Sequence, residues 1–469
     1  MGTLTMKFGG ASVGTTTALS QVLSIIIHES KRWDKVLIVA SALEGVTDML
    51  LEAAQLAQLS NQRGYRRIVA TLRTRHMALI EQLPLGNTER TTLQADVDRL
   101  LFDMLDQCQM VANNLNDELS PKVSDSIVAV GERLSARIIA ALLRQNDLRG
   151  IAVDGTDILM TDDVHGNAMP DLQLTATRVN DILLPMLNRD IIPVVTGYIG
   201  ATVNGATTTL GRGGTDYTAS VLSALIEADE LWIWTDVDGM MSSDPREIPE
   251  AHVIKELNYN EVAELAYFGA KILHSRMIVP LQERSLPLRI KNVFKPQETG
   301  TRVSHDEQDT PPSIKAVTSI QGLALSRAVS GSTAGIVKMV GNTLFKTLGM
   351  RSEVMISSQS SNSSFLCLVI PTSIGIDGVD RLQHAIQEKM SEYPEKMPWD
   401  IQTISIVTAI GNKLNHSPAI MGKVLEQLQN IEVYGLAMGP SNCSISVAIS
   451  TEDTHRALES IHQLTIKSG

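Results

Sequence analysis

Two glycine-rich stretches, each with a basic residue, have the composition of anion-binding loops. The first, "MKFGGASVG", contains Lys7, Gly9 and Gly10, and the second, "TLGRGGTDYTA", contains Arg212 among glycines. Glycine lets the backbone approach an anion closely, and the N–H groups at the start of a helix favour negative charge. The second stretch does not have the spacing of a Walker A loop. We therefore expect two anion sites that differ from a P-loop.

The second stretch offers a planar guanidinium group ahead of a predicted helix. Arg212 can bind a carboxylate or a phosphate through two parallel hydrogen bonds. Thr215 or Asp216 is expected to cap the helix that follows. Asp216 could serve as a cap alone, or it could also face the ligand.

Three further stretches contain polar side chains at predicted ligand positions. Glu132 in "VGERLSAR" is either a solvated helix carboxylate or the partner of an ammonium group. Ser41 and Thr47 in "SALEGVTDM" can hold an anion or simply cap a helix. The stretch "WTDVDGMMSSDPR" carries several aspartates and Arg246 after a buried strand, where α/β folds place ligands, although Asp-Gly and Asp-Pro pairs also favour turns.

These stretches alternate with strands and helices over roughly the first 300 residues. The segments "TLTMKF", "KVLIVASA", "DIIPVVTGYI" and "ELWIWTDV" are typical of buried strands, and "GVTDMLLEAAQLAQL" and "IVAVGERLSARIIAALLRQN" have helical periodicity. Such alternation predicts an α/β fold with a mainly parallel sheet and helices on both faces. The region from about 61 to 118 is predicted to be a helical insertion.

The stretch from Pro287 to Pro312 is polar and proline-rich, and we interpret it as a domain boundary. Two similar strand-helix-strand-strand-helix units follow it. Their predicted elements are 322–328, 332–348, 352–357, 364–370 and 378–391 in the first unit, and 402–409, 417–430, 431–438, 443–449 and 452–462 in the second. Each has the size of a ferredoxin-like unit, and small-ligand sensing and dimerisation are equally good hypotheses for the pair.

Composition excludes several classes of protein. The net charge of −12 argues against a nucleic-acid partner. The sequence has no long apolar run that would cross a membrane and no signal peptide, so we expect a cytoplasmic protein. The three cysteines match no metal or disulfide spacing and are expected to be reduced and buried.

Taken in order, the stretches resemble the aspartokinases of the amino acid kinase family. The matching segments are "KFGGASVG", "SALEGVTD", "GERLSAR", "TLGRGGTDYTA", "WTDVDGMMSSDPR", "AYFGAKILHSR" and "IKNVFKPQETGT", and the C-terminal repeats resemble a tandem pair of ACT domains. The chain is most similar to the kinase half of bifunctional aspartokinase–homoserine dehydrogenases. The resemblance implies a three-layer amino acid kinase domain over 1–300, followed by two ferredoxin-like βαββαβ domains over 301–393 and 394–469.

The resemblance also implies roles for particular residues. Catalysis is assigned to Lys7 and Asp216. Aspartate binding is assigned to Ser41, Thr47, Glu132, Arg212, Gly213, Gly214 and Thr215. ATP binding is assigned to Lys7, Phe8, Gly9, Gly10, Thr235, Asp236, Met241, Arg246, Lys271 and Ile272, where Met241 replaces a usual tyrosine. Gln359, Ser360 and Asn442 are the expected contacts of an amino-acid effector, lysine or threonine.

The implied reaction is phosphoryl transfer from MgATP to the β-carboxylate of L-aspartate, without a protein-bound metal. The β-carboxylate has an ordinary pKa of about 3.9 and is already ionised at neutral pH, so no general base is needed. Catalysis then depends on positioning and on positive charge. A kinase for another amino acid such as glutamate, or a non-catalytic amino-acid sensor, remains an alternative. The ACT pair is expected to support a homodimer or homotetramer, or to act mainly as a dimer scaffold.

Overall fold

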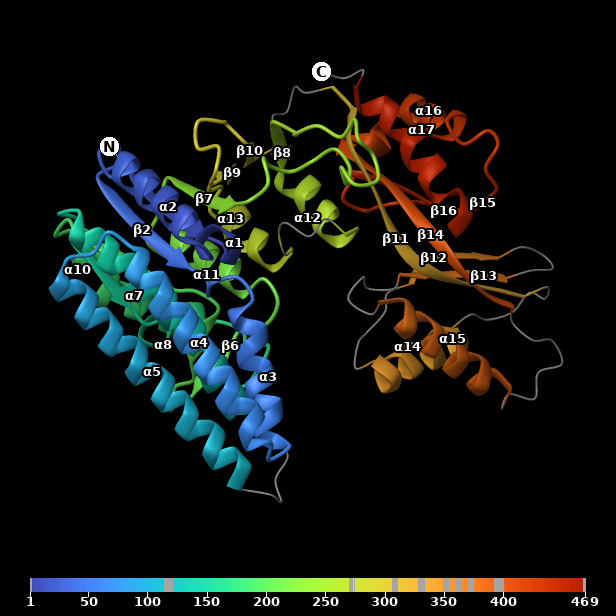
Figure 1. Ribbon diagram of the computed structural model, residues 1–469. Coiled ribbons are helices and arrows are strands. Elements are labelled where there is room, and N and C mark those ends of the chain that lie inside the picture. The colour runs from blue at the N-terminus through green and yellow to red at the C-terminus, as the bar shows by residue number, and fades with distance from the viewer. Residues whose placement is uncertain are drawn as a thin grey trace. The chain divides into compact units, whose positions relative to one another are not determined.

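The computed structural model describes residues 2–113, 121–269, 273, 275–305, 311–327, 334–348, 354–359, 364–369, 375–391 and 400–466 (Figure 1). The chain forms two compact units. Unit 1 contains residues 1–240, 255–259 and 273–305, and unit 2 contains residues 241–254, 260–272 and 306–469. Each unit has its own sheet and core.

Unit 1 is built on an eight-stranded sheet of order β3-β4-β2-β1-β7-β9-β10-β8. The strands are β1 (Thr3–Phe8), β2 (Lys35–Ala40), β3 (Gly150–Val153), β4 (Ile192–Thr196), β7 (Glu230–Thr235), β8 (Glu256–Asn258), β9 (Leu288–Asn292) and β10 (Thr301–Ser304). All neighbours pair in parallel except β9 and β10. This confirms the predicted mainly parallel sheet. The sequence pattern did not indicate β9 and β10, which lie in the polar stretch from Pro287 to Pro312.

Helices cover both faces of this sheet, because alternate strand residues point in opposite directions. Leu4, Met6 and Phe8 of β1 join the large core formed with α2 (Thr16–Glu29) and α7 (Val130–Gln145). The intervening residues of β1 point to the opposite face, where α11 (Gly214–Leu225) packs on β1 and β7. The other described helices of unit 1 are α1 (Gly10–Val13), α3 (Val46–Gln58), α6 (Pro121–Val128), α8 (Gly155–Ile158), α9 (Leu172–Arg178), the π-helix Val179–Leu183, α10 (Leu184–Leu187), the 3₁₀-helix Ser275–Met277 and α13 (Ile278–Glu283).

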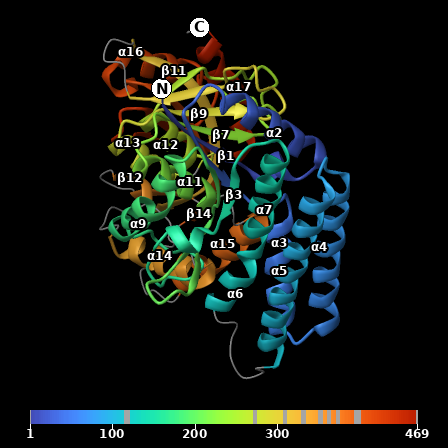
Figure 2. The same cartoon turned by 90° about the vertical axis from the view of Figure 1, so that its left-hand side faces the viewer.

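The predicted helical insertion consists of two long helices, α4 (Gln62–Gln82) and α5 (Asn87–Asn113). Both views show them side by side with α3 (Figures 1 and 2). Their buried apolar residues, such as Leu72, Val97 and Leu101, belong to the same core as α7. The insertion therefore extends the core on one face of the sheet.

The strand register aligns the carboxyl ends of the central strands. Phe8 pairs with Ala40 and with Trp234, and Ala40 pairs with Thr196. The loops after β1, β2, β4 and β7 therefore leave from one edge, which is where parallel α/β sheets bind their ligands. An antiparallel hairpin of β5 (Ile199–Ala201) and β6 (Thr207–Thr209) follows β4 and leads into α11.

Unit 2 contains a six-stranded antiparallel sheet of order β12-β13-β11-β14-β16-β15. Its strands are β11 (Ser313–Arg327), β12 (Val354–Gln359), β13 (Ser364–Val369), β14 (Asp400–Asn412), β15 (Val433–Met438) and β16 (Ser444–Ser450). The helices are α12 (Tyr259–Tyr267, whose first residue belongs to unit 1), α14 (Ala334–Leu348), α15 (Gly375–Ser391), the 3₁₀-helix Leu414–His416, α16 (Pro418–Glu426), the 3₁₀-helix Thr451–Asp453 and α17 (Thr454–Ile466).

The two predicted repeats therefore exist, but their first strands are longer than expected. β11 begins at Ser313 rather than Gly322, and β14 runs from Asp400 to Asn412. β11 pairs with β14 along nearly its whole length, including the additional residues, so the two repeats form one continuous sheet. The three cysteines are buried and form no disulfide, as predicted. Among the described residues, no helix is both long enough and apolar enough to cross a membrane.

Candidate functional site

The centre of the candidate site is an ion pair between Lys7 and Asp216. Strand alternation directs Lys7 from β1 toward α11, and its Nζ lies 2.5 Å from Oδ1 of Asp216. Both residues are buried, with exposures of 8% and 9%. The opposite charges therefore compensate each other in this buried setting.

The predicted helix cap in the second glycine loop is wrong. Helix α11 begins at Gly214 and is capped by Gly213, which has a φ of 74°. Thr215 and Asp216 lie within the first turn. Gly213 takes the cap position because the chain enters the helix through the left-handed region, which favours glycine. Asp216 is thereby released from capping and can pair with Lys7.

The first glycine loop is held close to the loop after β2. Gly9 caps α1, and the amide of Glu44 donates to the carbonyl of Gly10 at 3.2 Å. A Cβ atom on Gly10 would lie 3.1 Å from the carbonyl oxygen of Ala42. A side chain at this position would make an unusually tight contact, so glycine favours the close approach of the two loops at the sheet edge.

Glu132 is buried behind this surface, in the first turn of α7. It is 3% exposed, and its Oε1 accepts a long 3.4 Å hydrogen bond from the amide of Ala42. Within the described part of the chain, its Oε2 has no hydrogen-bond partner. Burial raises the pKa of Glu132 to about 8. A buried carboxyl group with an unused oxygen is a strong site for a cationic ligand, because a cation would both pair with it and ionise it.

The second glycine loop is packed against Tyr198, which follows β4. A Cβ atom on Gly214 would lie 2.7 Å from Cδ2 of Tyr198. The amide of Tyr198 is bonded to the hydroxyl of Thr218 on α11, and its backbone has a φ of 67°. Burial raises the pKa of the Tyr198 phenol above its ordinary value. Tyr198 therefore joins the end of β4 to the loop that carries Arg212.

Arg212 is exposed at the tip of this loop, whereas Gly214 and Thr215 are buried. Ser41 and Thr47, in the loop after β2 and the first turn of α3, are partly exposed. The structure thus brings all the residues predicted to bind aspartate to one edge of the sheet. Together with Lys7 they present two cationic side chains, hydroxyl groups and one buried carboxyl group, a set that suits a zwitterionic amino acid with an additional anionic group.

The Phe8 side chain, in contrast, lies in the core. It stacks on Trp234 with ring centroids 6.2 Å apart. At this position only the backbone is available to a nucleotide. Its neighbour Gly9 is tied to the same strand through the bond from its amide to the carbonyl of Trp234.

Hydrogen bonds from the end of β9 and the turn that follows it hold the loop after β7 in place. Thr235 donates to Asp236 at 3.1 Å, and Asn292 donates to Oδ1 of Asp238 at 2.6 Å. Lys295 bonds to the other oxygen of Asp238 at 2.7 Å. These contacts fix the aspartate-rich turn in which the predicted nucleotide residues Thr235 and Asp236 lie.

The remaining predicted nucleotide and effector residues belong to unit 2 or lie outside the described residues. Arg246 is exposed and bonded to Asp244, and Met241 forms an isolated bridge with Val253. Asn442 is exposed, with a φ of 61°. Gln359 is the last residue of β12. Lys271, Ile272 and Ser360 lie outside the described residues.

Sequence reasoning missed three residues around this site: Tyr198, Asn292 and Asp125. Asn292 is the last residue of β9, at the ligand edge of the sheet. Its position could have been predicted only if β9 had been recognised as a strand. Tyr198 follows β4 in the segment "TGYI", where a left-handed non-glycine residue has no sequence signature. Asp125 lies on α6, and its partners come from segments distant in the sequence.

The residues described in the structure contain no group of three or more His, Cys, Asp or Glu side chains that could hold a metal ion.

Comparison with known proteins identifies related sequences. The amino acid kinase family matches residues 3–292, and an ACT domain matches residues 407–464. The chain is 29% identical to the Arabidopsis thaliana chloroplastic bifunctional aspartokinase/homoserine dehydrogenase 1, over 97% of this chain and 50% of that protein. It is 27% identical to the lysine-sensitive aspartokinase 3 of Escherichia coli, over 97% of each. The chain thus spans about half the length of the bifunctional relatives.

Comparison with solved structures also finds aspartokinases. E. coli aspartokinase III in complex with aspartate and ADP has a TM-score of 0.78 and 26% identity, with 99% of each chain covered. The same enzyme in complex with lysine and aspartate has a TM-score of 0.79 and 26% identity, with 98% of each chain covered. The likeness therefore extends over both units of this chain.

Proposed function

Because the chain belongs to the amino acid kinase family, we propose from the geometry of its site that it is an aspartate kinase. It transfers the γ-phosphoryl group of MgATP to the β-carboxylate of L-aspartate and releases ADP and 4-phospho-L-aspartate. Support comes from relatives named aspartokinase and from the likeness to an aspartokinase bound to aspartate and ADP. The reaction would open the synthesis of amino acids derived from aspartate.

One observation carries the substrate assignment: the buried carboxyl group of Glu132 with its unused oxygen. A bound cation would allow this group to ionise, and the ammonium group of an amino acid supplies such a cation. Arg212, exposed beyond Tyr198, offers a planar pair of donors to the α-carboxylate. The side chain of aspartate is then directed toward Lys7.

The chemical step requires positive charge rather than a base. An oxygen of the β-carboxylate forms a bond to the γ-phosphorus, while the bond from that phosphorus to the bridging oxygen of ADP breaks. Two anions must approach each other, so Lys7 and the amide of Gly10 at the start of α1 stabilise the transferring group, while Gly9 lets the backbone approach it closely. Asp216 holds Lys7 until the phosphate arrives. The magnesium ion enters with ATP as part of the substrate.

For the nucleotide, Thr235, Asp236, Met241, Arg246, Lys271 and Ile272 remain the proposed contacts. The hydrogen bonds of Asn292 and Lys295 to Asp238 support this proposal, because they fix the turn after β7 at the ligand edge. A fixed turn reduces the entropy lost when a ligand binds.

We also propose that the C-terminal region is regulatory, with a kinase domain over 1–300 and ACT domains over 301–393 and 394–469. The match to an ACT domain and the lysine-sensitive relative support this view. Lysine or threonine would bind near Gln359, Ser360 or Asn442, and the ACT domains would join two or four copies. An inhibition screen with both amino acids, combined with light scattering, tests effector and oligomer separately.

The activity itself is tested by coupling ADP release to a spectrophotometric signal, with aspartate, glutamate and other amino acids as substrates. We expect turnover with aspartate to exceed that with glutamate. Lack of turnover with aspartate, in protein that binds ATP, would refute the proposal. Preference for glutamate would redirect it to another acyl-phosphate-forming kinase.

A further inference from the structure

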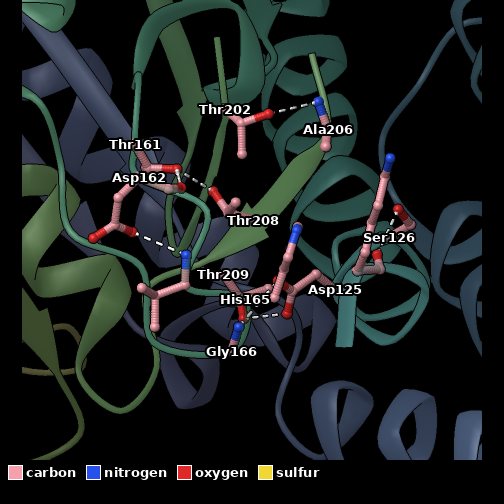
Figure 3. Close-up of polar contacts among 12 residues, drawn as sticks. Asp125, Ser126, Thr161, Asp162, His165, Gly166, Thr202, Ala206, Thr208 and Thr209 are labelled. Carbon is pink, nitrogen blue, oxygen red and sulfur yellow. Dashed lines mark hydrogen bonds and ion pairs between the residues drawn. The ribbon is translucent and has the colours of Figure 1, made fainter. Parts of the chain in front are cut away.

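Asp125 is a buried acid that the proposed reaction does not use. It lies on α6, is 4% exposed, and receives three short contacts from two other segments. Its Oδ1 accepts from the hydroxyl of Thr209 at 2.6 Å, and its Oδ2 accepts from the amide of Gly166 at 3.0 Å and contacts Nδ1 of His165 at 2.9 Å. Figure 3 shows this carboxylate between the three partners. A buried carboxylate with every oxygen engaged fixes the groups that surround it.

The first partner connects Asp125 to the Arg212 loop along the chain. Thr209 is the last residue of β6, three positions before Arg212. The Thr209 side chain also contacts the phenol of Tyr198, whose ring packs on Gly214. The amide of Leu210 donates to the carbonyl of Tyr198 at 2.9 Å. The side chain of Thr209 thus contacts the buried Asp125 as well as Tyr198, which packs on the glycine loop.

The second and third partners connect Asp125 to the same loop through space. Gly166 and His165 belong to a tight loop closed by Asp162, whose carboxylate accepts from the amides of Val164 and Met169. This loop supports Gly211, because a Cβ atom there would lie 2.8 Å from Oδ1 of Asn167 and 3.0 Å from the carbonyl oxygen of Gly166. Gly211 directly precedes Arg212. Asp125 therefore holds both the strand that enters the loop and the segment on which the loop rests.

We propose that Asp125 is a positioning residue for aspartate binding, which acts through Thr209 and the 162–169 loop to hold Arg212 in place. The inference rests on the proposed function, since it assigns Arg212 to the α-carboxylate of the substrate. Asp125 touches no reacting group. Its loss would therefore weaken aspartate binding and leave ATP binding unchanged.

The neighbouring strand residue provides a matched control. Thr208 is buried and its hydroxyl pairs with that of Thr161 at 2.7 Å, apart from Asp125 (Figure 3). Thr208→Val and Thr209→Val each remove one buried hydroxyl from β6, so they have similar structural costs. Only Thr209→Val breaks the connection to Asp125, and Thr209→Ser keeps it.

The experiment measures kcat and KM for aspartate and for ATP in the full chain, together with the thermal midpoint of each variant. We expect Asp125→Asn and Thr209→Val to raise KM for aspartate about tenfold and to leave KM for ATP unchanged. A tenfold change corresponds to the loss of one buried hydrogen bond. Thr209→Ser and Thr208→Val should keep the wild-type KM for aspartate.

Equal KM values for aspartate in Thr209→Val and Thr208→Val would overturn the inference, whatever their thermal midpoints. If Asp125→Asn does not fold, the two threonine variants and Thr209→Ser decide the matter alone. Failure of the proposed function is separate, because it would appear as absence of turnover in the wild-type chain.

Discussion

Nζ of Lys7 lies 2.5 Å from Oδ1 of Asp216, so the cation at the end of β1 already has a counter-charge in the first turn of α11. Without this partner, a nearly buried ammonium group would lose solvation with no compensation. With it, the lysine is held at the ligand edge before any phosphate binds. This arrangement explains how a nearly buried charge can be held at the ligand edge of the sheet.

Replacement of Lys7 by alanine should lower kcat by about a hundredfold or more, since it removes a charge that stabilises the transferring phosphoryl group. Steady-state kinetics at saturating aspartate and MgATP measure this effect. Lys35→Ala is the matched control. Lys35 bonds to Asn188 at the opposite end of β2 and should not alter kcat. An unchanged kcat in Lys7→Ala would remove Lys7 from the mechanism.

Aspartate binding should release about one proton near pH 7. Burial raises the pKa of Glu132 to about 8, so the ligand-free carboxyl group is mostly protonated, and an ammonium group would require it to ionise. Calorimetric titrations in phosphate and in Tris buffer should therefore give different heats. The difference should vanish in Glu132→Gln. Identical heats in the two buffers for the wild-type chain would contradict the assignment of Glu132 to the ammonium group.

The same carboxyl group should make stability depend on pH. The folded protein holds the proton up to about pH 8, whereas the unfolded chain loses it near the ordinary value of 4.5. The free energy of unfolding therefore falls as pH rises between these values, by on the order of a few kcal/mol. Thermal melts from pH 5 to 8 should show a smaller decline for Glu132→Gln than for the wild type. Parallel declines would argue that Glu132 is ionised without a ligand.

Arg212→Lys should raise KM for aspartate about tenfold or more, because a single ammonium group cannot reproduce the two parallel hydrogen bonds of a guanidinium group. KM for ATP should stay the same. Arg178→Ala on α9 removes another exposed arginine and serves as control. A rise in KM for ATP instead would place Arg212 at the nucleotide.

Gly211→Ala should impair aspartate binding more than Gly205→Ala. Both glycines have positive φ, 71° and 76°, so each substitution carries the backbone cost of about 1 kcal/mol. Only at Gly211 would the new Cβ also meet other atoms, whereas Gly205 has open space around it. KM for aspartate and thermal midpoints measure the two effects. Similar KM values in both variants would show that the loop tolerates displacement.

Periodicity and composition predicted the fold well where the chain has strong patterns. The buried strands β1, β2, β4 and β7, the insertion helices and both C-terminal repeats were all indicated by the sequence. The short strands β9 and β10 were not, because polar and turn residues surround them. The predicted cap of α11 was also wrong, because the chain enters this helix through the left-handed conformation of Gly213, which places Asp216 inside the first turn.

The loops of the candidate site could be predicted from the sequence, but the residues that hold those loops in place could not. Lys7, Glu132 and Arg212 each lie in a recognisable motif, and parallel-strand topology implies that their loops meet. Asp125 and Tyr198 lie outside the recognised patterns, since their importance depends on contacts between segments that are distant in the sequence.

The pairing of β11 with β14 has a consequence for how the chain is made. Thirteen pairs join the two strands, yet about ninety residues separate their starting points. As the chain leaves the ribosome, β11 is complete long before β14 exists, and the edge of β11 that later pairs with β14 exposes its backbone groups in the interval. We expect this half-formed sheet to be the stage at which newly made chains need chaperones or aggregate.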